Sequence, residues 1–182
     1  MPGYMAIGTL PPYEITVAAH PIVIEFDESW AHEAFVTRMR VGDQVVYPPP
    51  CASPQALAAL CSKAYRELGG HEVFAVKLVG QDVTAELADF LFAAVYEGAG
   101  DCGAYGYWLV RVESARVRAT PPVRGCFAGP RRSRDDGGVQ EPTVRWRRPL
   151  SITVDTEAGA QGRPSWQLDE GTFTWTRTGQ SR

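Results

Sequence analysis

A glycine-rich loop, Gly98–Gly103, is the feature that most constrains the fold of this chain. It has the spacing G-x-G-x-x-G, which is typical of loops that bind dinucleotide phosphates. Such a loop must follow a strand and begin a helix, because the helix N-terminus offers unpaired N–H groups to the pyrophosphate. Here the segment before the loop has helical spacing, and the segment after it, Tyr105–Arg118, is extended in character. We therefore predict the reverse order of elements and no bound cofactor.

Two helices are predicted, at 54–68 and 83–97. For the first, Ser53 is a suitable N-cap, Pro54 suits the first helical position, and two glycines follow the end. The second begins near Asp82 or Thr84 and is followed by Gly98. Its apolar stripe is formed by Leu87, Phe90, Leu91, Ala94 and Val95.

The remaining regular segments are rich in alternating and β-branched residues, which favour strands. They are 13–26 (interrupted at His20–Pro21), 34–47 (with a turn at Gly42–Asp43), 72–79, 105–118, 143–156 and 166–176. A helix from Ser29 to Arg40 is the alternative for part of the second segment. The order of elements predicts one α+β domain over 1–182, with a mostly antiparallel sheet and two helices on one face. Residues 120–142, which are rich in Arg, Gly and Pro, are expected to form a mobile loop.

Charge and cysteine content narrow the classes of function. The net charge is −3, with −8 over residues 1–110 and +5 over residues 111–182. This asymmetry indicates either a partner for one face or attraction between the two halves of the chain. No run of 18 apolar residues and no basic, apolar leader is present, which predicts a cytoplasmic protein without a membrane span. The four cysteines have no zinc-site or C-x-x-C spacing, so we predict reduced thiols and no metal.

A run of arginines with an interleaved aromatic residue, Val144–Pro149, is the main candidate for a binding surface. Arginines bind phosphates or carboxylates, and an aromatic ring can stack on a base. The alternative interpretation is a solvated strand edge, where charge discourages pairing between sheets. The predicted contact residues for a protein partner or a nucleic acid are Arg131, Arg132, Arg134, Arg145, Trp146, Arg147 and Arg148.

No catalytic residue is predicted, although one arrangement stays open. Histidines at 20, 32 and 71 have no clear carboxylate partner, except that Glu28 and His32 would share a face of a helix. A surface pair is the expected role for these two. A His/Cys site that assembles only in the fold, for instance from His71 with Cys61 or Cys102, is the alternative.

The segment ELADFLFAAVYEGAG…YGYW resembles a pattern in small uncharacterised phage and mobile-element proteins. In that pattern an apolar helix ends in an acidic-glycine turn and continues into a Tyr-Trp strand. An insertion, Ala99–Tyr105, separates the two parts here. The resemblance covers about 25 residues, and the matching positions are Ala88, Phe90, Leu91, Ala94, Glu97, Gly98, Gly106, Tyr107 and Trp108.

The resemblance implies a phage or plasmid accessory protein, and the arginine-rich, lysine-poor composition suggests a high-GC bacterial or phage genome. We therefore expect a non-enzymatic binding protein that acts through a protein partner. The alternatives are a nucleic-acid-associated protein that uses the Arg/Trp strand, and a small enzyme with a His/Cys site.

Overall fold

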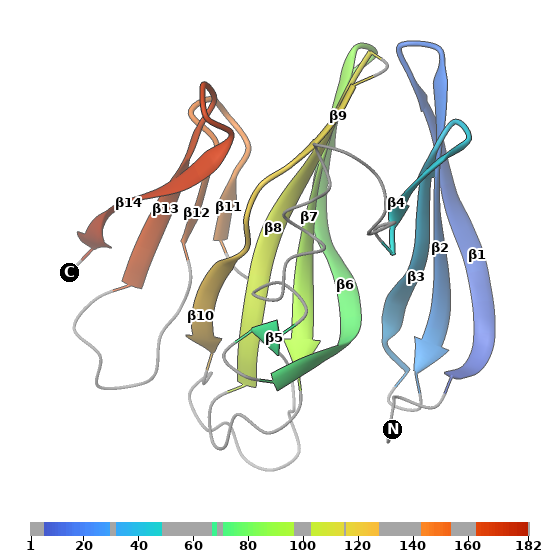
Figure 1. Ribbon diagram of the computed structural model, residues 1–182, viewed down its shortest axis with the longest axis horizontal. Coiled ribbons are helices and arrows are strands. Elements are labelled where there is room, and N and C mark those ends of the chain that lie inside the picture. Colours follow the sequence, from blue (N-terminus) through green and yellow to red (C-terminus); the bar gives the residue numbers. More distant parts are fainter. Residues whose placement is uncertain are drawn as a thin grey trace.

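The computed structural model describes residues 6–29, 32–48, 67–68, 71–96, 103–114, 116–127, 143–153 and 163–181. Over these residues all regular structure is β-strand, arranged in three antiparallel sheets (Figure 1). The predicted α+β class is therefore wrong for the described part of the chain. The segment 83–97 contains a strand instead of a helix, and the other predicted helix, 54–68, lies outside the described residues up to position 66.

The first sheet is an antiparallel meander of consecutive strands. It contains β1 (Ala6–Val17), β2 (His20–Ser29), β3 (Ala34–Val41) and β4 (Gln44–Tyr47), in the order β1-β2-β3-β4. The predicted hairpin at 34–47 is confirmed, with Gly42 at a φ of +55° in its turn. The helix from Ser29 to Arg40, the alternative for this segment, is wrong. The first turn falls at Ala18 and Ala19, just before the predicted break.

The central sheet has six strands and contains the two strands that flank the glycine-rich loop. Its members are β5 (Glu67–Leu68), β6 (His71–Val83), β7 (Leu87–Tyr96), β8 (Gly103–Glu113), β9 (Arg116–Ala119) and β10 (Val123–Phe127). The order is β10-β8-β7-β6-β5, and β9 also pairs with β8. The predicted strand at 105–118 is thus a hairpin, which turns at Ser114 with a φ of +51°.

The third sheet is formed by the C-terminal part of the chain. It contains β11 (Thr143–Arg145), β12 (Ser151–Thr153), β13 (Arg163–Asp169) and β14 (Thr174–Ser181), in sequence order. The predicted strands at 143–156 and 166–176 each fall on two strands. The first part of the expected loop at 120–142 forms β10, and residues 128–142 lie outside the described residues.

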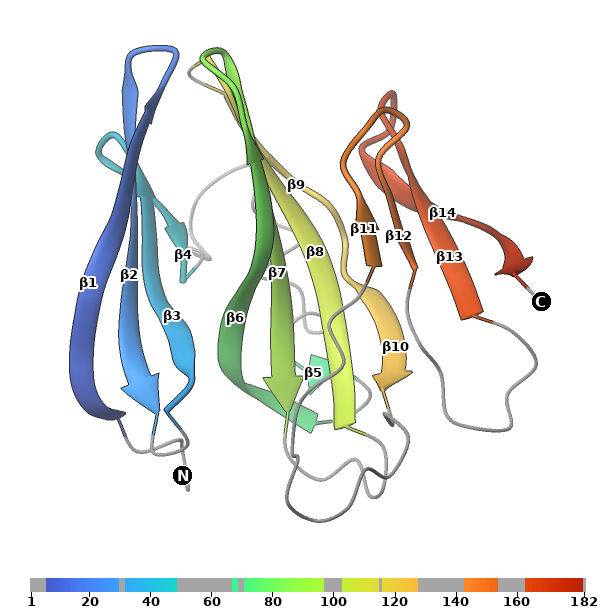
Figure 2. The ribbon, with the colours of Figure 1, turned by 180° about the vertical axis from the view of Figure 1, so that it is seen from behind.

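The central sheet lies between the other two sheets, as both ribbon views show (Figures 1 and 2). One of its faces packs on the first sheet, where Phe90, Phe92 and Trp108 meet Ile22, Ile24 and Met39. The opposite face packs on the third sheet, where Leu91, Leu109 and Tyr107 meet Ile152 and Leu168. Successive residues of a strand point to opposite faces, so β7 and β8 supply both cores.

This position explains why β7 was wrongly predicted to be a helix. A strand covered on both faces is almost continuously apolar, so it matches a helical stripe as well as an extended one. The preceding Thr84 also imitates an N-cap: its Oγ1 accepts hydrogen bonds from the N–H groups of Glu86 (3.4 Å) and Leu87 (3.0 Å). In the fold these bonds close the turn between β6 and β7.

The element before the glycine-rich loop is therefore a strand, which corrects one half of the predicted order. The other half is confirmed, because Gly103 begins β8 and β8 pairs antiparallel to β7. A dinucleotide loop would need a helix to begin at this point. Within the described residues there is also no helix with the length and apolarity needed to span a bilayer.

Candidate functional site

A row of charged residues crosses the central sheet on the face that packs against the third sheet. Asp89 of β7 lies directly opposite Arg111 of β8, and Arg111 lies opposite Arg118 of β9. Asp89 and Arg111 are only 4% and 3% exposed, so both charges are removed from water. A buried charge is stable only with close partners, and the register of β7, β8 and β9 places these partners side by side.

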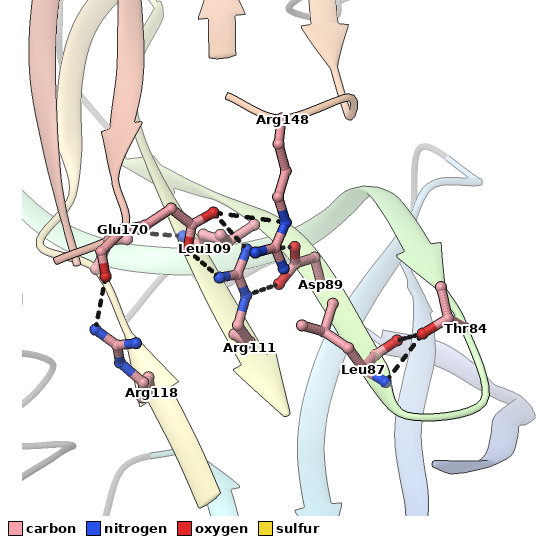
Figure 3. A network of polar contacts seen from close by, with 9 residues as sticks. Thr84, Leu87, Asp89, Leu109, Arg111, Arg118, Arg148 and Glu170 are labelled. Carbon is pink, nitrogen blue, oxygen red and sulfur yellow. Dashed lines mark hydrogen bonds and ion pairs between the residues drawn. The ribbon is translucent and has the colours of Figure 1, made fainter. Parts of the chain in front are cut away.

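Arg111 is held by carboxylates from two sheets (Figure 3). Its Nε and Nη2 donate to the two carboxylate oxygens of Asp89, at 2.7 and 2.8 Å. Its Nη1 donates to Oε2 of Glu170, and its Nη2 lies 3.3 Å from Oε1 of the same residue. Glu170 belongs to the turn between β13 and β14. Arg111 therefore joins the central sheet to the third sheet.

Phe173 and Trp175 extend this contact with polar and aromatic interactions. The Arg118 guanidinium lies 4.1 Å from the centroid of the Phe173 ring, and that of Arg111 lies 5.3 Å from it. The indole N–H of Trp175 donates to Oγ1 of Thr120 at 2.9 Å. The same oxygen accepts the main-chain N–H of Leu109 at 2.9 Å. These are directional contacts, so they define how the third sheet sits on the central one.

The turn that carries Glu170 is shaped by its neighbour Asp169. Oδ1 of Asp169 accepts the main-chain N–H groups of Gly171 (2.8 Å) and Thr172 (3.1 Å). The bonds from Thr172 and then from Gly171 favour the charged carboxylate, so they lower the pKa of Asp169 below its usual 3.8. The ionised side chain of Asp169 thereby helps to position Glu170 over Arg111.

The electrostatics of Arg111 indicate a structural role for this cluster. Burial by itself would lower the pKa of Arg111, but the hydrogen bonds and charges of Asp89 and Glu170 outweigh burial and raise this pKa. The guanidinium is thus permanently charged, buried and engaged by two carboxylates. An external ligand does not reach it, so we assign the Asp89–Arg111–Glu170 cluster to packing between the sheets.

The predicted arginine surface lies next to this cluster, on β11 and the bend that follows it. Arg145 and Arg147 are exposed, and Arg148 is 62% exposed with its Nε 3.9 Å from Oε1 of Glu170. Trp146 instead points inward and packs with the core between the central and third sheets. A Cβ on Gly80 of β6 would lie only 3.0 Å from Cζ2 of the Trp146 ring, so the absence of a side chain on Gly80 makes room for the indole.

The structure therefore separates the predicted contact residues. Arg145, Arg147 and Arg148 remain accessible, whereas Trp146 anchors their segment to the central sheet. The other three predicted residues, Arg131, Arg132 and Arg134, lie outside the described residues. Over the described residues of the third sheet, 143–153 and 163–181, five basic and two acidic side chains give a net charge of +3.

The alternative His/Cys site is not assembled by the described residues. His32 forms an exposed pair with Glu28, at 2.8 Å from Nδ1 to Oε1, at the end of β2 rather than on a helix. Cys61 and Cys102 lie outside the described residues, and so does the side chain of His71. In the part of the chain that the structure describes, no cluster of His, Cys, Asp or Glu is arranged to hold a metal ion.

Sequence reasoning missed the buried ion pair of the sheet interface, Asp89 and Arg111. Arg111 was not singled out within the predicted strand at 105–118, and Asp89 was placed on the predicted helix at 83–97. A signal was nonetheless present, because each is a lone charge inside an otherwise apolar run. Such a charge on a buried strand requires a partner of opposite sign on a neighbouring strand.

Comparison with protein-family models, curated protein sequences and solved structures finds no match to this chain. The resemblance to phage and mobile-element proteins therefore stays a prediction. Over its described residues, the chain is an all-β arrangement of three stacked antiparallel sheets, with an arginine-bearing segment fixed at the boundary of two of them.

Proposed function

We propose that this chain is a non-enzymatic binding protein that acts through a protein partner with an acidic surface. The contact residues are Arg145, Arg147 and Arg148. The observation that carries the proposal is the anchoring of this segment: Trp146 is seated against Gly80 while the exposed arginines flank it. A segment that is already ordered loses little conformational entropy on binding, so its arginines are pre-organised for carboxylates.

A protein partner is favoured over a nucleic acid by the position of Trp146. Binding to single strands relies on aromatic rings that are free to stack on bases. The Trp146 ring is already used by the core, which leaves the arginines alone to contact phosphates. The bacterial or phage origin and the cytoplasmic location belong to the same proposal. The latter rests on four cysteines without disulfide or metal spacing.

The test uses a fluorescent polyglutamate peptide and a single-stranded DNA oligonucleotide of equal length, with binding followed by anisotropy. The wild-type chain is expected to bind the peptide in a salt-dependent way. The double variant R145A/R147A is expected to weaken this binding by at least about tenfold, because charge-assisted contacts are lost. The control R38A/R116A removes the same charge from exposed positions on β3 and β9 and is expected to bind as the wild type does.

Two results contradict the proposal. One is absence of peptide binding by the wild type, or binding that the R145A/R147A variant retains. The other is preferential binding of the oligonucleotide that is lost in the same variant, which would replace the protein partner by a nucleic acid.

A further inference from the structure

Strand β14 forms an open edge of the third sheet. In the described part of the chain it pairs with β13 on one side only (Figures 1 and 2). It is 8 residues long and contains no proline, and Thr176–Gly179 are exposed. A bulge at Thr178 interrupts its pairing with β13, so Thr174–Arg177 is the regular part of this edge. A regular open edge of this kind can pair with another strand.

The other sheet edges are protected or short. Strand β1 carries Pro11 and Pro12 and is irregular between Leu10 and Tyr13, which hinders the addition of a strand. The strands β4, β5, β9, β10 and β11 are only 4, 2, 4, 5 and 3 residues long. Among the edges that the structure describes, β14 is thus the one that remains available for pairing.

The main-chain groups that β14 presents at this edge follow from its pairing. The N–H of Leu168 donates to the carbonyl of Leu150 at 2.8 Å, so the main-chain N–H and C=O of Leu168 point away from β14. Leu168 pairs with Trp175, so Trp175 also directs its main-chain groups away from β13. Because these directions alternate along a strand, the main-chain groups of Arg177 also point to the open edge, whereas those of Thr176 point toward β13.

We propose that β14 pairs antiparallel with β14 of a second copy of this chain, with Thr176 opposite Thr176. In this register Trp175 of each copy lies opposite Arg177 of the other copy. These are the two residues whose main-chain groups face the open edge. Each such pair exchanges both of its hydrogen bonds, as in a regular antiparallel ladder. The two third sheets then form one continuous sheet about a twofold axis.

The side chains of β14 are complementary to themselves in the same register. Arg177 lies opposite the uncharged Trp175 of the other copy, so no two like charges face each other. Thr174 lies opposite Thr178, where the bulge of β14 begins. A register centred on Arg177 would instead place two positive charges opposite each other. The positions of charge and of the open main-chain groups therefore select the same register for pairing with a second copy of this chain.

The charge of the third sheet predicts how salt affects this dimer. Each copy has a net charge of +3 over the described residues of that sheet. The two sheets repel each other over a distance that salt shortens. The dimer is therefore expected to become more stable as salt is added, which is opposite to the salt dependence expected for the acidic peptide.

Sedimentation of the full chain from micromolar to millimolar concentration tests the dimer. R177P removes an N–H that points to the open edge and leaves the bonds to β13 in place. It is expected to weaken the dimer by at least about tenfold. R177A keeps this N–H and is therefore expected to weaken the dimer less than R177P does. A wild-type chain that stays monomeric at every concentration and salt level overturns the proposal, and leaves the edge to a strand of another protein.

Cysteine cross-linking tests the register without relying on R177P to fold. Under mild oxidation T176C is expected to form a disulfide between the two copies of residue 176, identified by peptide mass mapping. T174C alone is not expected to do so, but a mixture of T174C and T178C is expected to cross-link. No cross-link in T176C, or equal cross-linking of T176C and T174C, overturns the register. The R145A/R147A variant is expected to dimerise normally, so this proposal and the proposed function fail separately.

Discussion

The two faces of the central sheet hold their neighbouring sheets in different ways. The face toward the first sheet has an apolar core that includes Phe90 and Trp108, and the polar contacts Gln81–Tyr13 and Lys77–Glu33 lie at exposed or half-buried positions. The face toward the third sheet adds the buried Asp89–Arg111–Glu170 cluster to its apolar contacts. The same two strands, β7 and β8, supply both faces through alternate residues.

This difference shows how one sheet specifies two kinds of interface. Apolar packing is nearly non-directional and tolerates changes that conserve volume. The charged cluster is directional, because the planar guanidinium of Arg111 donates hydrogen bonds only in fixed directions. The outer sheets differ in charge as well: six acidic and two basic side chains in residues 6–29 and 32–48 give −4, against +3 for the third sheet.

The largest expected effect is that of Arg111→Ala. It leaves the buried Asp89 without its cation, and loss of one partner of a buried pair costs about 3 to 5 kcal/mol. Urea unfolding followed by tryptophan fluorescence measures this loss. A control on the apolar face, Met39→Leu, conserves volume and is expected to cost less than about 1.5 kcal/mol.

Removal of both charges tests whether the loss in R111A comes from the unpaired Asp89 carboxylate or from the loss of the ion pair itself. If the unpaired carboxylate dominates, the double variant D89L/R111L is more stable than R111A, because no charge remains buried on the central sheet. A double variant that is less stable than R111A would show that the ion pair itself contributes net stability, and the comparison of the two faces would have to be revised.

The next effect concerns Gly80, where the Trp146 ring contacts the main chain. Gly80→Val places a side chain where Cβ alone would approach Trp146 to 3.0 Å, so overpacking is expected to cost about 1 to 3 kcal/mol. Gly8→Val is the matched control, because a Cβ at Gly8 meets nothing within 4 Å. Equal unfolding midpoints for the two variants would show that Trp146 is not seated on β6.

Trp175→Phe tests a single hydrogen bond between the sheets. It removes the N–H that donates to Thr120 and retains most of the ring, so a loss of about 1 kcal/mol is expected. Thr120→Val is expected to cost more, since it also deprives the N–H of Leu109 of its acceptor. Thermal unfolding of both variants checks this order, and a reversed order would contradict it.

The smallest effect is a pH dependence from Asp169. Its pKa is lower in the folded chain than in the unfolded chain, so it stabilises the fold above its unfolded value of 3.8. That contribution is lost as the pH falls through the folded-state pKa. Asp169→Ala should therefore destabilise the chain at neutral pH, and this loss should shrink progressively as the pH falls below 3.8. The control Asp43→Ala removes another exposed carboxylate, and an identical pH profile in both would refute the role of the turn.

Turn residues made some strands predictable from sequence. The hairpin at 34–47 follows from alternation on each side of Gly42–Asp43, and both strands lie where expected. The turn at Ser114, by contrast, was missed because serine in a positive-φ conformation leaves no clear signal in the sequence. The arginine surface was predicted as residues, but the inward position of Trp146 was not.

The amino-acid sequence by itself determined where most strands of the described part lie, because alternation and turn residues act between near neighbours. The tertiary structure decided whether 83–97 is helix or strand, since an apolar run satisfies either until sheets cover both of its faces. It also decided that the charged cluster forms, because Asp89 and Arg111 are 22 residues apart in the sequence and Glu170 is 59 residues from Arg111. Only strand register and sheet stacking bring such distant charges within hydrogen-bonding distance.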